Sequence, residues 1–431
     1  MNTYLGIDLG TSACRACVID AAGNEIANAR TDLPEASRDG VAVEQDAAVW
    51  WDALTATLDH LVTLFDARSL RRVALDATSS TLLLCAHDGT RLTPALMYGD
   101  ARATAQAQRI ADAAPADSAA TGASSSLAKL LYLLEHHACA QPLAAHQADW
   151  LGGMLCGRFG VCDENNALKL GYDAQQRRWP AWLAGLGLPP GCLPQVQPPG
   201  TPLGDILPAL CERWGLAPGT QLVCGTTDST AGVIATGARA LGDAVTALGS
   251  TLVLKVISDK PVTSPRHGVY SHRLGDRWLV GGASNTGGAV LASYFDAEKI
   301  AALSAQIDPR HPICLEYYPL PGVGERFPVA DPHLQSRVQP RPASDVRFLQ
   351  GLLQGVARIE LRGYRLLAEL GAPWPTRVLT VGGGAMNAPW TELRRRLLRV
   401  PVMPAAHGEA AYGAALLARE GFVDSNADAL T

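Results

Sequence analysis

The sequence lacks the features that mark membrane, secreted or nucleic-acid-binding proteins. Its 431 residues contain no apolar run near the roughly 20 residues that span a bilayer. The chain does not open with a basic segment followed by an apolar one, as a secretory signal does. The net charge is only −5, which gives no reason to expect nucleic acid or an anionic membrane as a partner. We therefore expect a soluble, cytoplasmic protein whose partners are small molecules.

Familiar metal and nucleotide motifs are missing as well. Only Cys14 and Cys17 form a C-x-x-C pair, and no second pair or pair of histidines lies at zinc-ligand spacing. Both lie in an expected strand, where residues three apart face opposite sides, so we expect ordinary buried thiols. The chain has no G-x-x-x-x-G-K-[ST] loop and no G-x-G-x-x-G after a strand. Three histidines without metal spacing are expected to be solvated or to cap helices: His136, His137 and His146.

What the sequence does contain is an alternation of strand and helix patterns, which predicts an α/β architecture. Expected strands cover 4–9, 13–20, a segment from Glu25, two segments within 72–90, and 379–381. Expected helices cover 46–65, 126–136, 345–370 and a segment that ends at Arg399. Residues 188–204 hold so much Pro and Gly that we expect a surface connection without regular structure. The length indicates about two or three domains.

The strongest internal signal is a repeat. Residues 9–20 (LGTSACRACVID) match residues 248–259 (LGSTLVLKVISD) in a Leu-Gly pair, two hydroxyl residues, a run of strand formers and a closing acid. One copy opens each half of the chain. The repeat predicts a duplicated hairpin, and therefore two related domains that face each other across a cleft.

Glycine and hydroxyl residues in these two hairpin turns suit phosphate binding. Glycine lets the backbone approach a ligand closely, and the turn N–H groups and hydroxyls can donate to phosphate oxygens. Either turn alone is as compatible with a plain β-turn, but two facing turns would hold a polyphosphate from both sides. The predicted phosphate contacts are Gly10, Thr11 and Ser12 in the first turn and Gly249, Ser250 and Thr251 in the second.

A third glycine cluster follows the strand expected at 379–381. It comprises Gly382, Gly383 and Gly384, at a strand-to-helix junction where the helix N-terminus favours anions. Asn387 and Trp390 are placed to flank a purine, although Trp390 is as well explained as a core residue. A fourth glycine-rich loop, 281–288, has no assigned use. A charge run is expected on a solvated helix face: Arg394, Arg395, Arg396 and Arg399.

Two carboxylates adjoin these turns. Asp8 lies just before the first phosphate turn, and Asp228 lies where a strand meets a helix of small residues. Phosphoryl transfer needs in-line positioning, a cation on the phosphates and an acceptor for the proton of the attacking hydroxyl. Asp8 is expected to serve Mg²⁺, which takes only one or two carboxylates, and to orient the acceptor. Asp228 is expected to be the base, with a helix N-cap as the simpler alternative.

Taken in order, the motifs resemble the FGGY family of carbohydrate kinases over nearly the whole length. The segments that carry the resemblance are GIDLGTS (6–12), YGDAR (98–102), CDENNALKLGYD (162–173), GTTDSTAG (225–232), ALGST (247–251), GERFP (324–328), VGGGAMN (381–387) and GEAAYGAALLA (408–418). Within the family, residues 163–173 and 281–291 look most like the D-ribulose kinase branch, which is close to the xylulokinases.

The resemblance implies two ribonuclease-H-like domains, of the actin and hexokinase type, that flank a catalytic cleft. A sugar-binding domain would cover 1–235 with 408–431 packed back onto it, and a nucleotide-binding domain would cover 236–407. It also implies ATP and Mg²⁺ as cofactors and phosphorylation of the terminal hydroxyl of a free ketopentose. The matching residues are Asp228 as base, Asp8 at sugar and metal, Ser79 at a sugar hydroxyl, Ser12, Ser250 and Gly383 at phosphates, and Asn387 and Trp390 at the adenosine.

Three functions stay open from the sequence. D-Ribulose is the first candidate substrate and D-xylulose the second. An actin-like or chaperone-type ATPase without a sugar acceptor would share the fold, because a fold alone does not define a reaction. Asp228 and the sugar-side segments favour the kinase, and the presence of both Asp8 and Asp228 disfavours a catalytically inactive sugar sensor.

Overall fold

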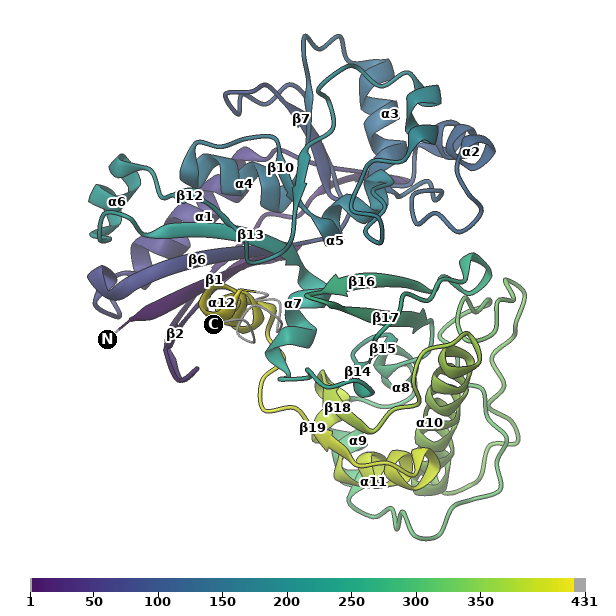
Figure 1. Ribbon diagram of the computed structural model, residues 1–431. Helices are drawn as coiled ribbons and strands as arrows, with labels where there is room; N and C mark the ends of the chain where they lie inside the picture. Colours follow the sequence, from purple (N-terminus) through teal and green to yellow (C-terminus); the bar gives the residue numbers. More distant parts are fainter. Residues whose placement is uncertain (1, 422–431) are drawn as a thin grey trace. The chain divides into compact units, whose positions relative to one another are not determined.

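The computed structural model describes residues 2–421, which belong to two compact units (Figure 1). Unit 1 comprises residues 1–235, 272–276 and 409–431, and unit 2 comprises residues 236–271 and 277–408. The segment 408–431 was predicted to pack back onto the first domain. Its last ten residues, 422–431, lie outside the described part of the chain. No helix between residues 2 and 421 is long and apolar enough to cross a membrane.

The elements alternate between strands and helices, which confirms the α/β prediction. The strands are β1 (Thr3–Leu9), β2 (Ala13–Asp20), β3 (Glu25–Asp32), β4 (Ser37–Asp39), β5 (Ala42–Gln45), β6 (Leu70–Ala77), β7 (Leu82–Cys85), β8 (Ala95–Leu96), β9 (Leu143–His146), β10 (Val161–Asp163), β11 (Gln195–Gln197), β12 (Pro202–Asp205), β13 (Gln221–Thr227), β14 (Asp243–Leu248), β15 (Leu252–Ser258), β16 (Tyr270–Leu274), β17 (Arg277–Ser284), β18 (Arg377–Val381) and β19 (Val402–Pro404). The α-helices are α1 (Ala48–Leu61), α2 (Thr104–Ala113), α3 (Ser126–His136), α4 (Gln147–Cys156), α5 (Glu164–Ala167), α6 (Pro208–Trp214), α7 (Asp228–Ala235), α8 (Gly288–Ala292), α9 (Ala297–Ser304), α10 (Asp345–Glu369), α11 (Ala388–Leu398) and α12 (Ala410–Glu420).

The two units share one strand topology. In unit 1 the sheet order is β12-β13-β6-β1-β2-β3, and in unit 2 five strands follow the order β17-β15-β14-β18-β19. The hairpins β1–β2 and β14–β15 are antiparallel. Strand β1 pairs in parallel with β6, and β14 pairs in parallel with β18. Strand β6 then pairs in parallel with β13, and β18 pairs in parallel with β19. This agreement confirms the predicted duplicated hairpin.

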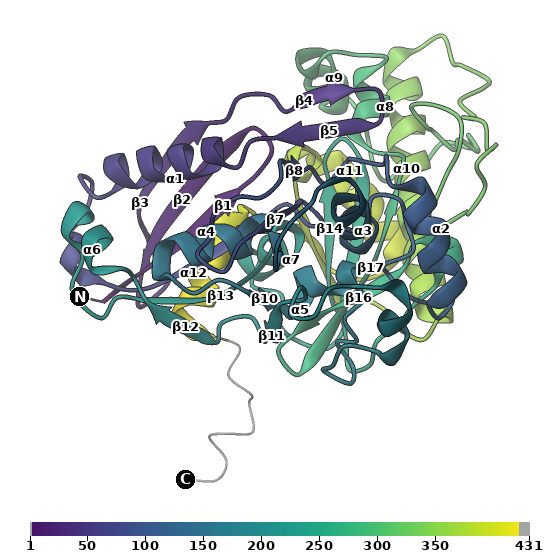
Figure 2. The same cartoon turned by 90° about the horizontal axis from the view of Figure 1, so that it is seen from above.

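Helices cover both faces of the unit 1 sheet. Leu5, Ile7 and Leu9 pack with α1 and α4 on one face, and Figure 2 shows α1 along β2 and β3. On the other face α12 lies across β1 and β6, beside α7 (Figure 1). Cys14 packs on the first face and Cys17 on the second, as the period of two predicts. Burial raises the pKa of each thiol to about 12, so both stay protonated.

The close approach of α12 to β1 depends on a glycine. A Cβ atom at Gly6 would lie 2.0 Å from the carbonyl oxygen of Ala411 and 2.2 Å from the amide nitrogen of Ala415. A Cβ at Gly413 of the same helix would lie 1.8 Å from the carbonyl oxygen of Ala231 in α7. The small residues of the segment 408–418 therefore let α12 lie directly on the strand that carries Asp8.

Unit 1 also contains a second sheet, of order β4-β5-β8-β7-β9, with α2 and α3 packed beside it. Helix α3 spans the residues expected from the sequence, and its apolar side chains Leu127, Leu130 and Leu131 pack in this smaller core. No element between residues 236 and 408 is paired in this sheet. The smaller sheet is therefore an addition to the duplicated frame.

Two expectations from the sequence are wrong. Residues 188–204 contain β11 and the start of β12, because Gln195–Gln197 pairs with β10 and Pro202 opens an edge strand, where a missing N–H is tolerated. Arg394 is not solvated: it is wholly buried and donates 2.7 Å bonds to both carboxylate oxygens of Glu360 on α10. A buried guanidinium needs such a bidentate partner. The other arginines of that run are exposed.

Substitution of Gly6 by alanine tests the packing of α12. Because the new methyl group would overlap the backbone of α12, we expect Gly6→Ala to destabilise unit 1 by about 3 kcal/mol, which corresponds to a fall in Tm of roughly 6–12 °C. The control is Gly185→Ala, where no atom lies within 4 Å of the new Cβ. Equal Tm values for the two variants in thermal denaturation would contradict this account.

Candidate active site

Three carboxylates meet at one edge of the unit 1 sheet. Strands β1, β6 and β13 run parallel, so their carboxyl ends lie together. Asp8 stands opposite Asp76 in the register of β1 and β6, and Asp76 stands opposite Thr226 in the register of β6 and β13. Two residues after Thr226, Asp228 is the first residue of α7. The sequence predicted Asp8 and Asp228 as site residues but did not single out Asp76.

Asp76 is the most deeply buried of the three, with no exposed surface. Burial raises its pKa well above the usual range, and the negative charges of Asp8 and Asp228 raise it further. Among residues 2–421, no N–H or hydroxyl group donates to either of its carboxyl oxygens. Burial and like charges both favour the protonated form of this carboxyl group.

Asp8 has a different environment. Burial raises its pKa, while the hydrogen bond with Asp76 and the charge of Arg15 lower it. The Arg15 Nη1 atom lies 3.1 Å from Asp8 Oδ2, because the two residues are partners in the β1–β2 hairpin. Arg15 therefore favours the ionised form of Asp8, in opposition to burial. Arg15 was not among the predicted site residues; the observed register of the hairpin places it opposite Asp8.

Asp228 lies at the start of α7, where it is partly exposed. Its Oδ1 atom accepts a 2.6 Å hydrogen bond from the backbone N–H of Ser229. This position matches both the predicted base and the simpler capping alternative. Because Asp228 also contributes to the raised pKa of Asp76, the three carboxyl groups interact electrostatically.

Ser79 lies in the turn that follows β6. Its Oγ atom is buried and has no hydrogen-bond partner within the described part of the chain. The next residue, Ser80, has φ = 70°, a backbone conformation that residues other than glycine and asparagine rarely adopt. Hydrogen bonds of Thr78 Oγ1 to Thr81 Oγ1 (2.6 Å) and Gln147 Oε1 (2.8 Å) brace the turn. The predicted sugar ligand thus belongs to a strained, braced loop near Asp76.

The first hairpin turn exposes Thr11 and Ser12, and the second exposes Ser250 and Thr251. In unit 2 the fourth glycine loop supports the second turn, since Gly288 N–H donates to the carbonyl oxygen of Gly249 at 2.7 Å. At Gly287, where φ is 150°, a Cβ would lie 2.6 Å from the carbonyl oxygen of Ser250. The loop for which the sequence offered no use therefore holds a predicted phosphate turn in place.

A cavity of about 770 Å³ lies in unit 2, next to this turn. Its volume falls in the range of small-molecule sites. The predicted ligand residues that line it are Gly249, Ser250, Gly383, Gly384, Asn387 and Trp390. Thr251 and Gly382 do not line it; a Cβ at Gly382 would lie 2.8 Å from the carbonyl oxygen of Leu248, so this glycine permits close packing.

Helices α8 and α9 supply cavity walls that were not predicted from the sequence. Ala289, Ile300, Ala301 and Ser304 all line it. The segment 297–304 is an ordinary amphipathic pattern, so nothing in its composition indicated a ligand. The wall is mostly apolar, which suits the flat face of a nucleobase and leaves orientation to a few polar groups.

Asn387 and Trp390 already have partners inside the protein. Asn387 Oδ1 accepts from the backbone N–H of Trp390 at 3.0 Å, and its Nδ2 donates to Ser304 Oγ at 2.9 Å. The indole N–H of Trp390 donates to the carbonyl oxygen of Leu353 at 3.1 Å, and the ring is 2% exposed. Trp390 therefore serves the core and the cavity wall together. The purine-flanking roles of both residues stay predictions.

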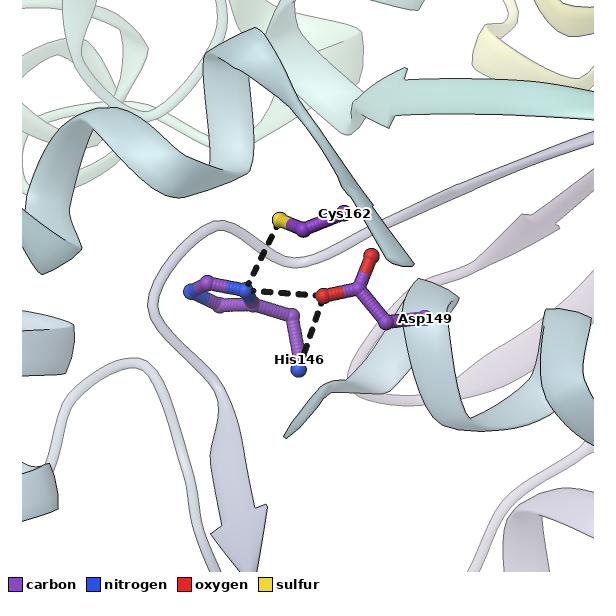
Figure 3. A group of neighbouring side chains, drawn as sticks. All are labelled: His146, Asp149 and Cys162. Carbon is purple, nitrogen blue, oxygen red and sulfur yellow. Dashed lines mark hydrogen bonds and ion pairs between the residues drawn. The ribbon is translucent and has the colours of Figure 1, made fainter. Parts of the chain in front are cut away.

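His146, Asp149 and Cys162 form a compact group in unit 1 (Figure 3), with one potential ligand atom each within 4.8 Å of the others. Asp149 Oδ2 accepts from both the backbone N–H of His146 (3.1 Å) and its Nδ1 (3.0 Å). This is a capping box at the start of α4, which confirms the capping role expected for His146. Burial raises the pKa of Cys162 well above its usual value, so the group is a hydrogen-bonded network with a protonated thiol.

Three features characterise the protein. It has a duplicated α/β frame, a cluster of carboxyl groups at one sheet edge in unit 1, and an apolar cavity beside a glycine-rich turn in unit 2. The model of the "FGGY family of carbohydrate kinases, N-terminal domain" matches residues 3–235, and the corresponding C-terminal model matches residues 244–419. The chain belongs to this family, whose members are phosphotransferases that use ATP and an alcohol group as acceptor. The predicted family and two-domain fold are thereby confirmed.

Three relatives illustrate the range of named substrates. The chain is 28% identical to the xylulose kinase of Streptomyces coelicolor, over 95% of this chain and 86% of that one. It is 25% identical to an autoinducer-2 kinase of Yersinia pseudotuberculosis, over 97% and 86% of the two chains. A crystal structure of a "xyloylose kinase" from Brucella ovis superposes with a TM-score of 0.86 at 26% identity, over 97% and 91% of the two chains.

Two substitutions of Asp76 test whether it acts as a protonated acid. Asparagine has an N–H that can replace the carboxyl proton, so Asp76→Asn should keep sugar phosphorylation within about tenfold of wild type. Asp76→Leu removes the donor to Asp8 and should lower kcat by about 100-fold. Coupled ADP release measures both. If the asparagine variant loses as much activity as the leucine variant, Asp76 acts as an anion and this assignment is wrong.

A matched pair on α9 tests the cavity. Ala301 lines it, while the exposed Ala302 does not. Ala301→Trp should weaken ATP binding by about tenfold or more, because the indole fills space in which a ligand would be buried. Isothermal titration calorimetry with ATP measures the effect, and Ala302→Trp should match wild type. Equal affinities for the two variants would place the nucleotide elsewhere.

Proposed function

We propose that the protein is an ATP-dependent kinase that phosphorylates the terminal hydroxyl of a free ketopentose, with D-ribulose as the first candidate and D-xylulose as the second. The observation that carries the proposal is Asp228 at the end of β13, beside two further carboxyl groups, in a chain of the carbohydrate kinase family. A hydrolytic ATPase needs only to orient water, whereas a kinase needs a base that faces an alcohol.

Asp228 would take the proton of the sugar hydroxyl. As the proton moves to its carboxylate, the hydroxyl oxygen forms a bond to the γ-phosphorus of ATP, and the bond between that phosphorus and the bridging oxygen breaks, which leaves ADP. Partial exposure gives Asp228 access to a ligand, while Asp76 keeps its own proton and does not compete as a base. Ser79 would bind a sugar hydroxyl through its unpartnered Oγ atom.

The nucleotide would occupy the cavity of unit 2. Its apolar wall suits the base, and Gly249, Ser250 and Gly383 lie where phosphates would leave the cavity. Gly10, Thr11 and Ser12 would contact phosphate from unit 1, with turn N–H groups and hydroxyls as donors. These assignments follow from the chemistry of glycine-hydroxyl turns.

Asp8 fits a magnesium ion. Arg15 favours its ionised form, and the exposed hydroxyls of Thr11 and Ser12 follow it closely in the chain. Mg²⁺ binds through one or two carboxylates and keeps several waters, so a single aspartate is a sufficient protein donor. When bound, the ion would offset the charge of the phosphates.

The choice of ketopentose is supported from two sides. Residues 163–173 and 281–291 resemble the D-ribulose kinase branch, and D-ribulose is therefore placed first. The xylulose kinases among the relatives support D-xylulose. The two sugars are epimers, so discrimination rests on the position of one hydroxyl group, which side chains near Asp76 and Ser79 would read.

A sugar panel with an Asp228 variant tests the proposal. Wild-type protein with ATP and Mg²⁺ should release ADP in the presence of D-ribulose, more slowly with D-xylulose, and least with a tetrulose or a polyol, and NMR should locate the new phosphate on the terminal carbon. Asp228→Ala should lower kcat by about 100- to 10,000-fold while calorimetry shows unchanged ATP binding.

Ser229→Ala is the control, because the backbone N–H that bonds Asp228 survives the change. ATP turnover that no sugar stimulates would contradict the kinase assignment and favour the hydrolytic ATPase. Activity of Asp228→Ala within a few fold of wild type would exclude Asp228 as the base.

A further inference from the structure

Lys129 on α3 is a wholly buried lysine that the proposed mechanism does not use. Its Nζ atom donates to three backbone carbonyl oxygens: Ser80 at 2.7 Å, Met97 at 2.7 Å and Tyr98 at 3.2 Å. An ammonium group has three donors and no acceptor, so these three bonds satisfy it completely. The side chain therefore joins two loops of unit 1 through their main chains.

Apolar packing does not explain this residue. Burial lowers the pKa of Lys129 to about 7, against the opposing charge of Asp100. Within residues 2–421, no carboxylate lies at ion-pair distance from its Nζ atom. Burial of an unpaired charge is costly, and methionine would fill the same space without that cost. The three carbonyl bonds are what a lysine adds here.

The first clamped loop is the turn that carries Ser79. Lys129 holds the carbonyl oxygen of Ser80, whose φ of 70° costs about 1 kcal/mol or more for a residue with a side chain. The orientation of the peptide at Ser80 determines where the neighbouring Ser79 points. The lysine bond therefore stabilises the strained turn in the form that presents Ser79.

The second clamped loop begins at Met97. It exposes the ring of Tyr98, which is 54% accessible, and continues to the buried Asp100. Asp100 is fixed by the backbone N–H of Val43 at 2.7 Å and by Arg102. The carbonyl oxygens of Ser80 and Tyr98 share one nitrogen atom, so they lie within two hydrogen-bond lengths of each other. The main chain of the exposed Tyr98 is thereby fixed close to the Ser79 turn.

We propose that Lys129 is a positioning residue for the acceptor sugar: it clamps the Ser79 turn to the Tyr98 loop, so that the hydroxyl of Ser79 and the ring of Tyr98 form a rigid wall for the ketose. The inference rests on the proposed function, because it assigns these loops to the sugar. Rigidity of this wall would set the distance between the sugar hydroxyls and Asp228, where a shift of about 1 Å can cost 100-fold in rate.

The test uses Lys129→Met in the full-length protein, with initial rates measured against sugar and against ATP. Methionine keeps the length of the side chain and removes all three donors. We expect the KM for the best ketopentose to rise by about tenfold or more, while the KM for ATP stays within twofold, since the unit 2 cavity is untouched. The control is Leu133→Ala on the same helix, a buried core residue, which should lower Tm and leave both KM values unchanged.

A rescue separates positioning from general stability. Ser80→Gly introduces a residue that adopts φ near 70° freely, so the double variant Lys129→Met with Ser80→Gly should recover part of the sugar KM. If Lys129→Met does not fold, Ser80→Val gives the same test from the other side, because a β-branched residue resists that φ while Lys129 stays intact. Its sugar KM should rise and its ATP KM should not.

The outcomes distinguish this inference from the function on which it rests. If wild type phosphorylates a ketose but Lys129→Met, or Ser80→Val in its place, leaves the sugar KM within twofold, the clamp is wrong and the kinase stands. An equal rise in both KM values also overturns the clamp. If wild type phosphorylates no sugar, the proposed function fails and the clamp fails with it.

Discussion

The site depends on one constraint, which is the burial of a carboxyl group between two others. Burial and the charges of Asp8 and Asp228 raise the pKa of Asp76 well above its usual range, which favours its protonated form. That proton in turn favours the ionised form of Asp8, which Arg15 also stabilises. Only Asp228, at the mouth of α7, is left partly exposed. The parallel register of β1, β6 and β13 produces all three environments, because it brings three strand ends to the same edge.

The duplicated frame shows how one topology supports two chemistries. The positions in unit 2 that correspond to Asp8 and Asp76 are Ala247 and Val381, which face each other in the register of β14 and β18. Three glycines follow Val381, and the adjoining cavity is mostly apolar. The same strand ends therefore hold carboxyl groups in unit 1 and apolar residues in unit 2. A carboxyl edge suits proton transfer, and an apolar pocket with a glycine turn suits a nucleotide.

Features that depend on local spacing could be predicted from the sequence. The hairpin repeat, the bounds of α3 and the opposite faces of Cys14 and Cys17 follow from periods of 2 and 3.6. Features that depend on partners far along the chain were not accessible. Arg394 looks solvated until Glu360 is placed beside it, and the α9 wall of the cavity has no compositional mark. Arg15 was missed because the pairing of Asp8 with Arg15 depends on the exact register of the hairpin, which the strand pattern alone did not define.

Relatives named for xylulose and for autoinducer-2 match this chain over nearly its whole length, so the fold alone does not separate their named substrates. Unit 1 differs from unit 2 by elements added to the duplicated frame. The sheet β4-β5-β8-β7-β9 and helices α2 and α3 are such an addition, and they border the turn of Ser79 and the loop of Tyr98. Lys129 fixes both loops by their carbonyl groups, so side chains on them can vary while their backbone stays in place.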